Sequence, residues 1–235
     1  MKFFIDTANI EQIKHAKDFG VLDGVTTNPS LMAKEGIKGQ KNIQDHYLKI
    51  CQIVDGDVSA EVISTNYKEM INEGETLSKI HKNIVVKIPM IKDGIKAIKY
   101  FHKKNIKTNC TLVFSLGQAI LAAKAGATYV SPFIGRLDDI GDDGVDLVSR
   151  ICKVYKNYHY ETKVLAASIR SKEHIIQCAE VGADVTLIET ALSPRSMSSN
   201  STTTFALLEA SAQKKATVKH QKQQQKRQQH SYPFS

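Results

Sequence analysis

Apolar residues along the chain fall into eight short runs, and the stretches between them repeat apolar positions with helical spacing. Val and Ile dominate the run Ile84–Pro89, which is typical of a strand buried on both faces of a parallel sheet. The predicted strands are Lys2–Asp6, Gly24–Asn28, Val58–Ile63, Ile84–Ile88, Thr108–Val113, Tyr129–Ile134, Val164–Ser168 and Val185–Glu189. The predicted helices are Asn9–Ala16 with Asn9 as its cap, a helix opening at Pro29, and His46–Val54, Tyr67–Ile80, Ile95–Lys103, Gln118–Ala125, Val145–Tyr155 and Glu173–Glu180.

Strands that alternate with helices predict parallel βαβ units. Eight such units in about 200–250 residues are the number that closes a (β/α)8 TIM barrel. The alternative is an open doubly wound sheet, but no Gly-rich dinucleotide fingerprint follows any strand, so we favour the barrel. Gly126 and Gly182 each separate a predicted helix from the next strand, where glycine supplies a left-handed helix cap.

The alternating pattern stops near the C-terminus. Residues 195–204 are rich in Ser and Thr, and residues 214–230 are rich in Gln and Lys, which is typical of disordered low-complexity chain. We therefore expect a barrel domain at residues 1–194 and an atypical basic tail at residues 195–235. A barrel also needs a helix after its eighth strand, and only residues 204–219 are available to form it.

The positive charge of the chain belongs to this tail. The formal net charge is +8, of which residues 195–235 carry +6 and residues 1–194 only +2. A basic tail raises the alternative of a protein that binds RNA or another polyanion. However, no aromatic residue is interleaved with its lysines before Tyr232, and no nucleic-acid fold signature is present. We therefore do not expect a nucleic-acid partner.

Other classes of protein are also disfavoured. Hydrophobic residues make up 42% of the chain, enough for a sizeable core, but no apolar run approaches the roughly 20 residues of a membrane span. Asp6 interrupts the N-terminal apolar residues before a targeting signal can form. The four cysteines are widely spaced without a CxxC pair, which favours reduced thiols. We expect a cytoplasmic protein with no membrane partner.

A single lysine interrupts the most apolar strand. Lys87 stands in the middle of Ile84–Pro89, whose other residues are apolar. Burial disfavours a charged ammonium, and a neutral lysine amine is a nucleophile toward carbonyl groups. The alternative is a lysine whose stem is buried while its ammonium reaches water at the strand end.

Polar residues also stand near the C-terminal ends of the predicted strands, where (β/α)8 barrels carry their chemistry. Inward-pointing polar groups are costly without a partner or a function, so we expect them to form one site around Lys87. They are Asp6, Thr26, Thr27, Asn28, Glu61, Asn109, Thr111, Ser131, Arg136, Ser168, Arg170 and Glu189.

Several of these residues have a structural alternative to a role in a site. The alternatives are a helix cap for Asp6, a turn and cap for residues 26–28, an ion pair with Lys87 for Glu61, a surface ion pair with Asp138 or Asp139 for Arg136, and a helix start for Ser168. For Glu189 we favour a structural ion pair at the barrel mouth over a catalytic role.

Together these residues suit carbonyl chemistry through a Schiff base. Lys87 would attack C2 of a ketose, and Glu61 would move protons directly or through a water. Asp6 would take the proton of a sugar hydroxyl during carbon–carbon cleavage. Two guanidinium groups and a hydroxyl, from Arg136, Arg170 and Ser168, would bind a phosphate. No residues have metal-ligand spacing, so we disfavour a metal-dependent aldolase and expect no cofactor.

At these residues the chain resembles the transaldolase family, specifically its small subfamily, which also contains fructose-6-phosphate aldolases. The resemblance covers about residues 1–192. The Thr-Thr-Asn-Pro-Ser segment combined with a Val-Lys-Ile-Pro strand is highly specific. The matching motifs are Phe4–Ala8, Gly24–Ser30, Val85–Pro89, Val130–Arg136 and Val164–Arg170.

The resemblance implies a role for each matching residue. Lys87 matches the Schiff-base lysine, and Asp6 matches the general acid/base of the aldol cleavage. Glu61 matches the carboxylate that works through a catalytic water, with Thr111 as its partner. The implied substrate contacts are Asn28 and Asn109 to sugar hydroxyls and the intermediate, Ser131, Thr26 and Phe133 to the substrate, and Arg136, Ser168 and Arg170 to the phosphate.

Two positions separate the branches of the subfamily. The aldolase branch has Gln where this chain has Glu61, and Tyr where it has Phe133. The resemblance therefore implies a transaldolase, which moves dihydroxyacetone from sedoheptulose 7-phosphate to glyceraldehyde 3-phosphate in the non-oxidative pentose phosphate pathway and leaves erythrose 4-phosphate and fructose 6-phosphate. A fructose-6-phosphate aldolase, which releases free dihydroxyacetone without an acceptor, is the alternative.

The C-terminus departs from the family pattern. The family follows its eighth strand with a helix that has a Pro-Leu-Thr-like start, and small members use this helix in ring-shaped oligomers. Residues Pro194–Ser199 do not match that start. The resemblance implies a homo-oligomer, and the departure falls on the segment that would build it.

Overall fold

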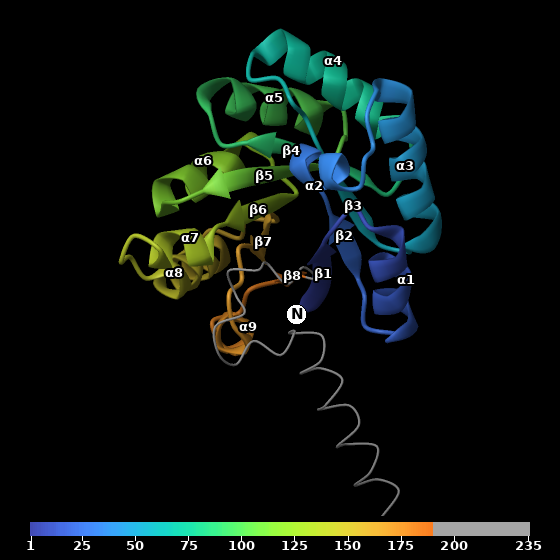
Figure 1. The fold of residues 1–235 in the computed structure, drawn as a ribbon. Helices are drawn as coiled ribbons and strands as arrows, with labels where there is room; N and C mark the ends of the chain where they lie inside the picture. Colours follow the sequence, from blue (N-terminus) through green and yellow to red (C-terminus); the bar gives the residue numbers. More distant parts are fainter. Residues whose placement is uncertain (190–235) are drawn as a thin grey trace, which may run out of the picture. The chain divides into compact units, whose positions relative to one another are not determined.

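A computed structural model describes residues 1–189 of the chain (Figure 1). Residues Met1–Ala191 form one compact unit. The expected tail at residues 195–235 and the expected helix within residues 204–219 lie outside the described residues.

Eight parallel strands close into a barrel in chain order, as the sequence predicts. The strand β1 pairs with both β2 and β8, and its register with β8 runs from Lys2↔Val185 to Asp6↔Glu189. The (β/α)8 barrel is thus confirmed. The strands are β1 (Lys2–Asp6), β2 (Gly24–Thr26), β3 (Asp57–Glu61), β4 (Ile84–Pro89), β5 (Thr108–Val113), β6 (Tyr129–Pro132), β7 (Lys163–Ala166) and β8 (Val185–Glu189).

Helices cover the outside of the barrel (Figure 1). Side-chain caps fix several of their starts: Asn9, for example, accepts a hydrogen bond from the backbone of Gln12. Gly126 and Gly182 have φ angles of 91° and 87°, which confirms the predicted left-handed turns before the next strands. The helices are α1 (Ile10–Asp18), α2 (Pro29–Lys34), α3 (Gln40–Ile53), α4 (Tyr67–Ser78), α5 (Lys92–Lys103), α6 (Leu116–Ala125), α7 (Ile134–Asp138), α8 (Gly144–Asn157) and α9 (Lys172–Glu180).

Four strands end two residues earlier than the sequence pattern predicts. Strands β2, β3, β6 and β7 stop at Thr26, Glu61, Pro132 and Ala166. Apolar or β-branched residues continue past each end, where pairing is reduced to isolated contacts such as the Phe133↔Ala167 bridge. The predicted strand Tyr129–Ile134 overlaps only the first residue of the short helix α7, and this helix was not predicted because five residues are too few to show helical spacing.

The alternation of side chains along the strands divides the core into two layers. Inside the barrel, Phe4, Val85, Leu165 and Val185 pack together. In the other layer, Val86 and Ile88 of β4 belong to a core cluster shared with helical residues such as Ile98. Because successive strand residues point to opposite faces, Lys87 faces the barrel interior two residues after Val85. The period of two therefore brings the lysine to the carboxyl end of the barrel.

Within residues 1–189, no helix is both long and apolar enough to span a bilayer.

We expect Phe101→Ala to destabilise the barrel strongly. Phe101 on α5 has no exposed surface, and its ring packs so closely on α4 that a Cβ at Gly74 would lie 2.4 Å from it. The lost burial and the cavity should lower the free energy of unfolding by about 3–5 kcal/mol, measured by urea denaturation. Ile140→Ala, at a side chain that is 73% exposed, should cost less than about 0.5 kcal/mol. Similar losses in both variants would contradict this packing.

Candidate active site

A cavity of about 540 Å³ opens at the carboxyl ends of the strands. Every residue that the sequence analysis assigned to catalysis or substrate binding lines it. The structure thus brings the proposed set together, while the individual roles stay predictions. These lining residues are Asp6, Thr26, Asn28, Glu61, Lys87, Asn109, Thr111, Ser131, Phe133, Arg136, Ser168 and Arg170.

Lys87 and Glu61 form a buried ion pair on neighbouring strands. They are directly opposite in the β3–β4 register, and Nζ of Lys87 lies 3.1 Å from Oε2 of Glu61. Their side chains are only 9% and 18% exposed. The same Nζ donates a hydrogen bond of 3.3 Å to the backbone carbonyl of Thr27. The predicted Lys87–Glu61 contact is therefore present, and the ammonium has two protein partners at the cavity wall.

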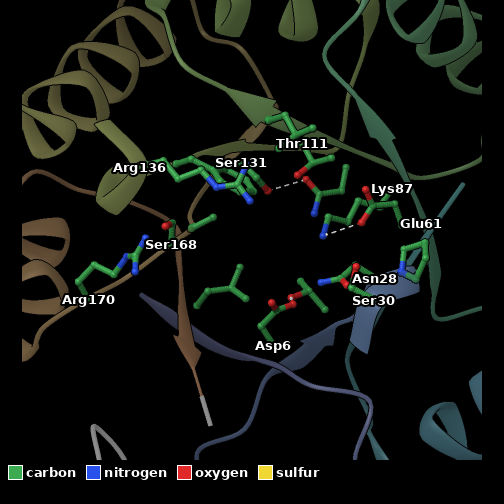
Figure 2. Close-up of a pocket in the computed structure, with 17 residues that line it drawn as sticks. Asp6, Asn28, Ser30, Glu61, Lys87, Thr111, Ser131, Arg136, Ser168 and Arg170 are labelled. Carbon is green, nitrogen blue, oxygen red and sulfur yellow. Dashed lines mark hydrogen bonds and ion pairs between the residues drawn. The ribbon is translucent and has the colours of Figure 1, made fainter. Parts of the chain in front are cut away.

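The hydroxyl of Thr111 faces the same part of the cavity without a protein partner. Thr111 is 1% exposed, and its Oγ1 makes no hydrogen bond among the described residues. Figure 2 shows it on the same side of the pocket as Lys87 and Glu61. A buried hydroxyl is costly without a partner, so this one is available to a water or a substrate oxygen.

A strained backbone in β5 turns two successive side chains into the cavity. The β5–β6 register shifts between Cys110 and Val113, and Leu112 has a φ of 61°. This left-handed conformation is uncommon for a bulky residue and is often found at functional sites. As a result Thr111 and Leu112 both line the cavity, although they would point to opposite faces of a regular strand. Nothing in the sequence marks Leu112.

Asp6 and Asn28 occupy the ends of the first two strands. The hydroxyl of Thr26 donates to Oδ1 of Asp6 over 2.5 Å. Asn9, and not Asp6, caps α1, so the alternative of a capping role for Asp6 is wrong. Asn28 does cap α2, because its Oδ1 accepts from the backbone of Leu31 over 2.9 Å. Its amide nitrogen is left for the cavity that it lines.

A chain of neutral hydrogen bonds fixes Asn109 beside Lys87. The hydroxyl of Ser131 donates to Oδ1 of Asn109 over 2.8 Å, and Nδ2 of Asn109 donates to the hydroxyl of Ser59 over 3.3 Å. All three side chains are buried. The orientation of the amide is therefore determined by its partners, and one Nδ2 hydrogen remains for a ligand.

Arg136, Ser168 and Arg170 lie across the pocket from Lys87 (Figure 2). The guanidinium of Arg136 lies 4.9 Å from the ring centre of Phe133, whose ring also packs against Phe114 at 5.8 Å. Such cation–π contact orients an arginine without neutralising it. Within residues 1–189, Arg136 has no ion-pair partner, so the predicted pairing with Asp138 or Asp139 is not found.

The two aspartates pair elsewhere. Asp139 Oδ2 accepts a hydrogen bond of 2.9 Å from Arg170, and Asp138 lies 3.3 Å from Nε2 of His174. The alternative of a surface ion pair for Arg136 is therefore wrong, because residues adjacent in the chain are not the nearest in space. Arg170 therefore enters the site with a carboxylate already bound.

Backbone contacts hold the two arginine-bearing segments together. The amide of Gly135 donates to the carbonyl of Ser168 over 2.9 Å. A Cβ at Gly135 would lie 2.4 Å from Nε of Arg170, so a larger residue would displace that side chain. Ser168 has a φ of 58° and does not start a helix, because Ser171 caps α9. The alternative of a helix start for Ser168 is therefore wrong.

Two further expectations concern Glu189 and metal binding. The backbone of Glu189 pairs with Asp6 at the ends of β8 and β1, but its side chain lies outside the described part of the chain. No group of three or more His, Cys, Asp or Glu within residues 1–189 is arranged to hold a metal ion.

The chain belongs to the transaldolase/fructose-6-phosphate aldolase family, whose family model matches residues 3–233. This match extends past residue 192, where the recognisable motifs end. A probable transaldolase of Phocaeicola vulgatus is 72% identical over 185 residues, which cover 79% of this chain and 85% of that protein. A probable transaldolase of Bacteroides thetaiotaomicron is 71% identical with the same coverage.

A solved structure resembles the barrel without close sequence similarity. It is a thiamine phosphate pyrophosphorylase from Pyrococcus furiosus, with a TM-score of 0.57 and 16% identity over 81% of this chain and 86% of that chain. Identity this low shows a shared fold alone.

Burial also sets the chemistry of the four thiols. It raises the pKa of Cys51, Cys110 and Cys178 from 9.0 to about 12, and that of Cys152 to about 11. At neutral pH the folded protein therefore holds protonated, unreactive thiols. Above about pH 9 the unfolded chain releases protons that the folded chain retains, so this difference lowers the stability of the fold as the pH rises from about 9 to 12.

We expect the folded protein to resist thiol reagents. With Ellman's reagent at pH 8, the native chain should react slowly, starting with the half-buried Cys152, and the chain in urea should release colour for all four cysteines. Cys152→Ser should remove the first reacting group. Rapid reaction of several thiols in the native protein would contradict their burial.

Proposed function

We propose that this protein transfers a dihydroxyacetone unit between sugar phosphates through a Schiff base on Lys87. Its family and the names of its curated relatives support a transaldolase-type enzyme. The observation that carries the proposal is the buried Lys87–Glu61 pair, 3.1 Å apart, beside the unpartnered hydroxyl of Thr111. An amine, a proton carrier and a site for water are the groups that Schiff-base formation requires.

The first half of the reaction joins the sugar to Lys87. Glu61 takes a proton from the ammonium, and the neutral amine attacks C2 of the ketose to form a carbinolamine. The carbinolamine hydroxyl leaves as water after accepting a proton, which Glu61 returns directly or through a water bound to Thr111. The product is a protonated imine, whose charge makes the next bond easier to break.

The second half exchanges the aldose. Asp6 takes the proton of the C4 hydroxyl, the C3–C4 bond breaks, and its electrons flow into the imine to leave an enamine on Lys87. Thr26, which donates to Asp6 over 2.5 Å, orients the carboxylate. After the first aldose leaves, the enamine attacks the aldehyde of a second one, and the same steps in reverse release a new ketose.

The opposite side of the pocket suits the phosphate of the substrate. Arg136, Ser168 and Arg170 supply two guanidinium groups and a hydroxyl there. Asn28 and Asn109 each keep an amide hydrogen for the sugar hydroxyls, which lie between C2 and the phosphate of the substrate. An open-chain ketose phosphate can therefore place C2 at Lys87 and its phosphate at the arginines.

Glu61 and Phe133 favour transfer over simple release of dihydroxyacetone. The ring of Phe133 packs against Phe114 and Arg136 and offers no hydroxyl to protonate the enamine. An unprotonated enamine persists until an acceptor aldehyde arrives. We therefore propose sedoheptulose 7-phosphate and glyceraldehyde 3-phosphate as substrates, in the non-oxidative pentose phosphate pathway.

Borohydride reduction in the presence of fructose 6-phosphate should trap a covalent adduct on Lys87, located by peptide mass mapping. Lys87→Met should trap none, because it lacks the amine. Lys96→Met, at an exposed lysine paired with Asp93, should trap as the wild type does. Trapping that is unchanged in Lys87→Met would refute the mechanism. Rapid release of free dihydroxyacetone without an acceptor would refute transfer in favour of an aldolase.

Arg136→Gln should weaken binding of phosphorylated substrates selectively. A hydrogen bond to a charged group contributes about 1.5–3 kcal/mol, so KM for fructose 6-phosphate should rise about 10- to 100-fold. Turnover of unphosphorylated fructose, which lacks the charge, should change little. The matched control is Arg150→Gln on α8, where the arginine pairs with Asp146 at the surface. Equal losses with both sugars would place the phosphate elsewhere.

A further inference from the structure

A buried phenol lies close to the Lys87–Glu61 ion pair but does not line the cavity. Tyr47 lies on α3 and is 2% exposed. Its hydroxyl lies 3.3 Å from Oγ1 of Thr27, whose own side chain has no exposed surface. The reaction proposed above assigns Tyr47 no role, yet it touches the residue whose carbonyl binds Lys87.

This contact falls where two strands separate. The β2–β3 pairing ends at Thr26↔Ser59, and the amide of Thr27 then donates to the carbonyl of Ser59 over 3.2 Å. Beyond that point β3 continues to Glu61, paired with β4, while the β2 chain turns away toward α2. The carbonyl of Thr27 accepts from Nζ of Lys87 over 3.3 Å. Both oxygen partners of the lysine therefore sit at the open end of this strand pair.

The phenol contacts the β2 side of that opening through the side chain of Thr27. Burial raises the pKa of Tyr47 to about 12, and the hydrogen bond with Thr27 opposes the rise. The hydroxyl is thus protonated at neutral pH and adds no charge near the ion pair.

The helix that carries the phenol is fixed in place. Ile50 and Cys51 of α3 are buried, and Nε2 of His46 lies 2.7 Å from the carbonyl oxygen of Ala8 in the β1–α1 connection. The ring of Tyr47 is therefore held by its helix and can in turn hold the strand ends. Small displacements matter here, because the rate of attack depends steeply on the distance and angle of the nucleophile.

We propose that Tyr47 is a positioning residue for the reactive lysine. Its hydroxyl contacts the side chain of Thr27, and so holds in place the residue whose carbonyl orients the amine of Lys87. This inference rests on the proposed function, because it concerns the step in which that amine attacks the ketose. Tyr47 itself touches no reacting atom.

The test compares Tyr47→Phe with Tyr155→Phe in the full-length protein. Tyr155 on α8 is an equally buried tyrosine, 4% exposed, whose hydroxyl donates to the carbonyl of Ala119 over 2.7 Å, far from the cavity lining. Loss of one hydrogen bond should lower kcat and the single-turnover rate of borohydride trapping about three- to tenfold in Tyr47→Phe, with KM for fructose 6-phosphate unchanged. Tyr155→Phe should lose as much thermal stability and retain the wild-type rates.

A second variant uses the partner hydroxyl and keeps the proposal testable if Tyr47→Phe folds poorly. Thr27→Val removes that hydroxyl but retains the carbonyl that binds Lys87. It should slow trapping by a similar factor, and the double variant should be no slower than either single one.

Three results would overturn the inference: wild-type trapping rates in Tyr47→Phe, equal slowing in Tyr155→Phe, or additive losses in the double variant. These results differ from failure of the proposed function. If the wild type forms no adduct on Lys87, the mechanism falls and the inference falls with it. If the wild type forms the adduct and Tyr47→Phe forms it equally fast, the inference alone is rejected.

Discussion

The ion pair between Lys87 and Glu61 is the contact on which the site depends. Two charges removed from water are costly, and their attraction offsets the cost only when the geometry is good and further hydrogen bonds are made. Here the strand register places the two residues side by side, and the carbonyl of Thr27 supplies a further acceptor. Neutral polar side chains surround the pair, and the deeper interior is filled by Phe4, Val85 and Leu165. The ion pair therefore lies at the polar opening of the barrel, above a layer of apolar side chains.

The two sides of the cavity are built by different means. On the lysine side, regular strands with fixed register place Glu61, Lys87 and Asn109 in neighbouring positions. On the arginine side the strands have ended. There Ser168 has a left-handed backbone conformation, and the absence of a Cβ at Gly135 leaves room for the side chain of Arg170. In the proposed reaction, the covalent chemistry would therefore fall on the rigid strands, and the phosphate would be bound beyond the strand ends.

Much of the fold and the candidate site can be predicted from the sequence, because both follow from short-range patterns. The eight strands show as short apolar runs between helical stretches, and the lining residues show as polar residues near strand ends. What could not be predicted depends on tertiary contacts. The φ of Leu112 is imposed by a bulge, the partner of Asp139 is 31 residues away, and Tyr47 looks like one more core aromatic on an amphipathic helix. Strand ends were overestimated for the same reason, since hydrophobicity continues past the point where the backbone turns.

The Arg170–Asp139 pair has a consequence for turnover. A transferase must let go of two phosphorylated products in each cycle, so a phosphate site that binds too firmly would make release the slow step. An arginine already joined to a carboxylate over 2.9 Å has a ready partner when the phosphate departs. If Arg170 binds the phosphate as proposed, the aspartate would compete with it and lower the affinity for substrate and product alike. In the proposed reaction, a carboxylate that opposes binding helps the enzyme to exchange its sugars.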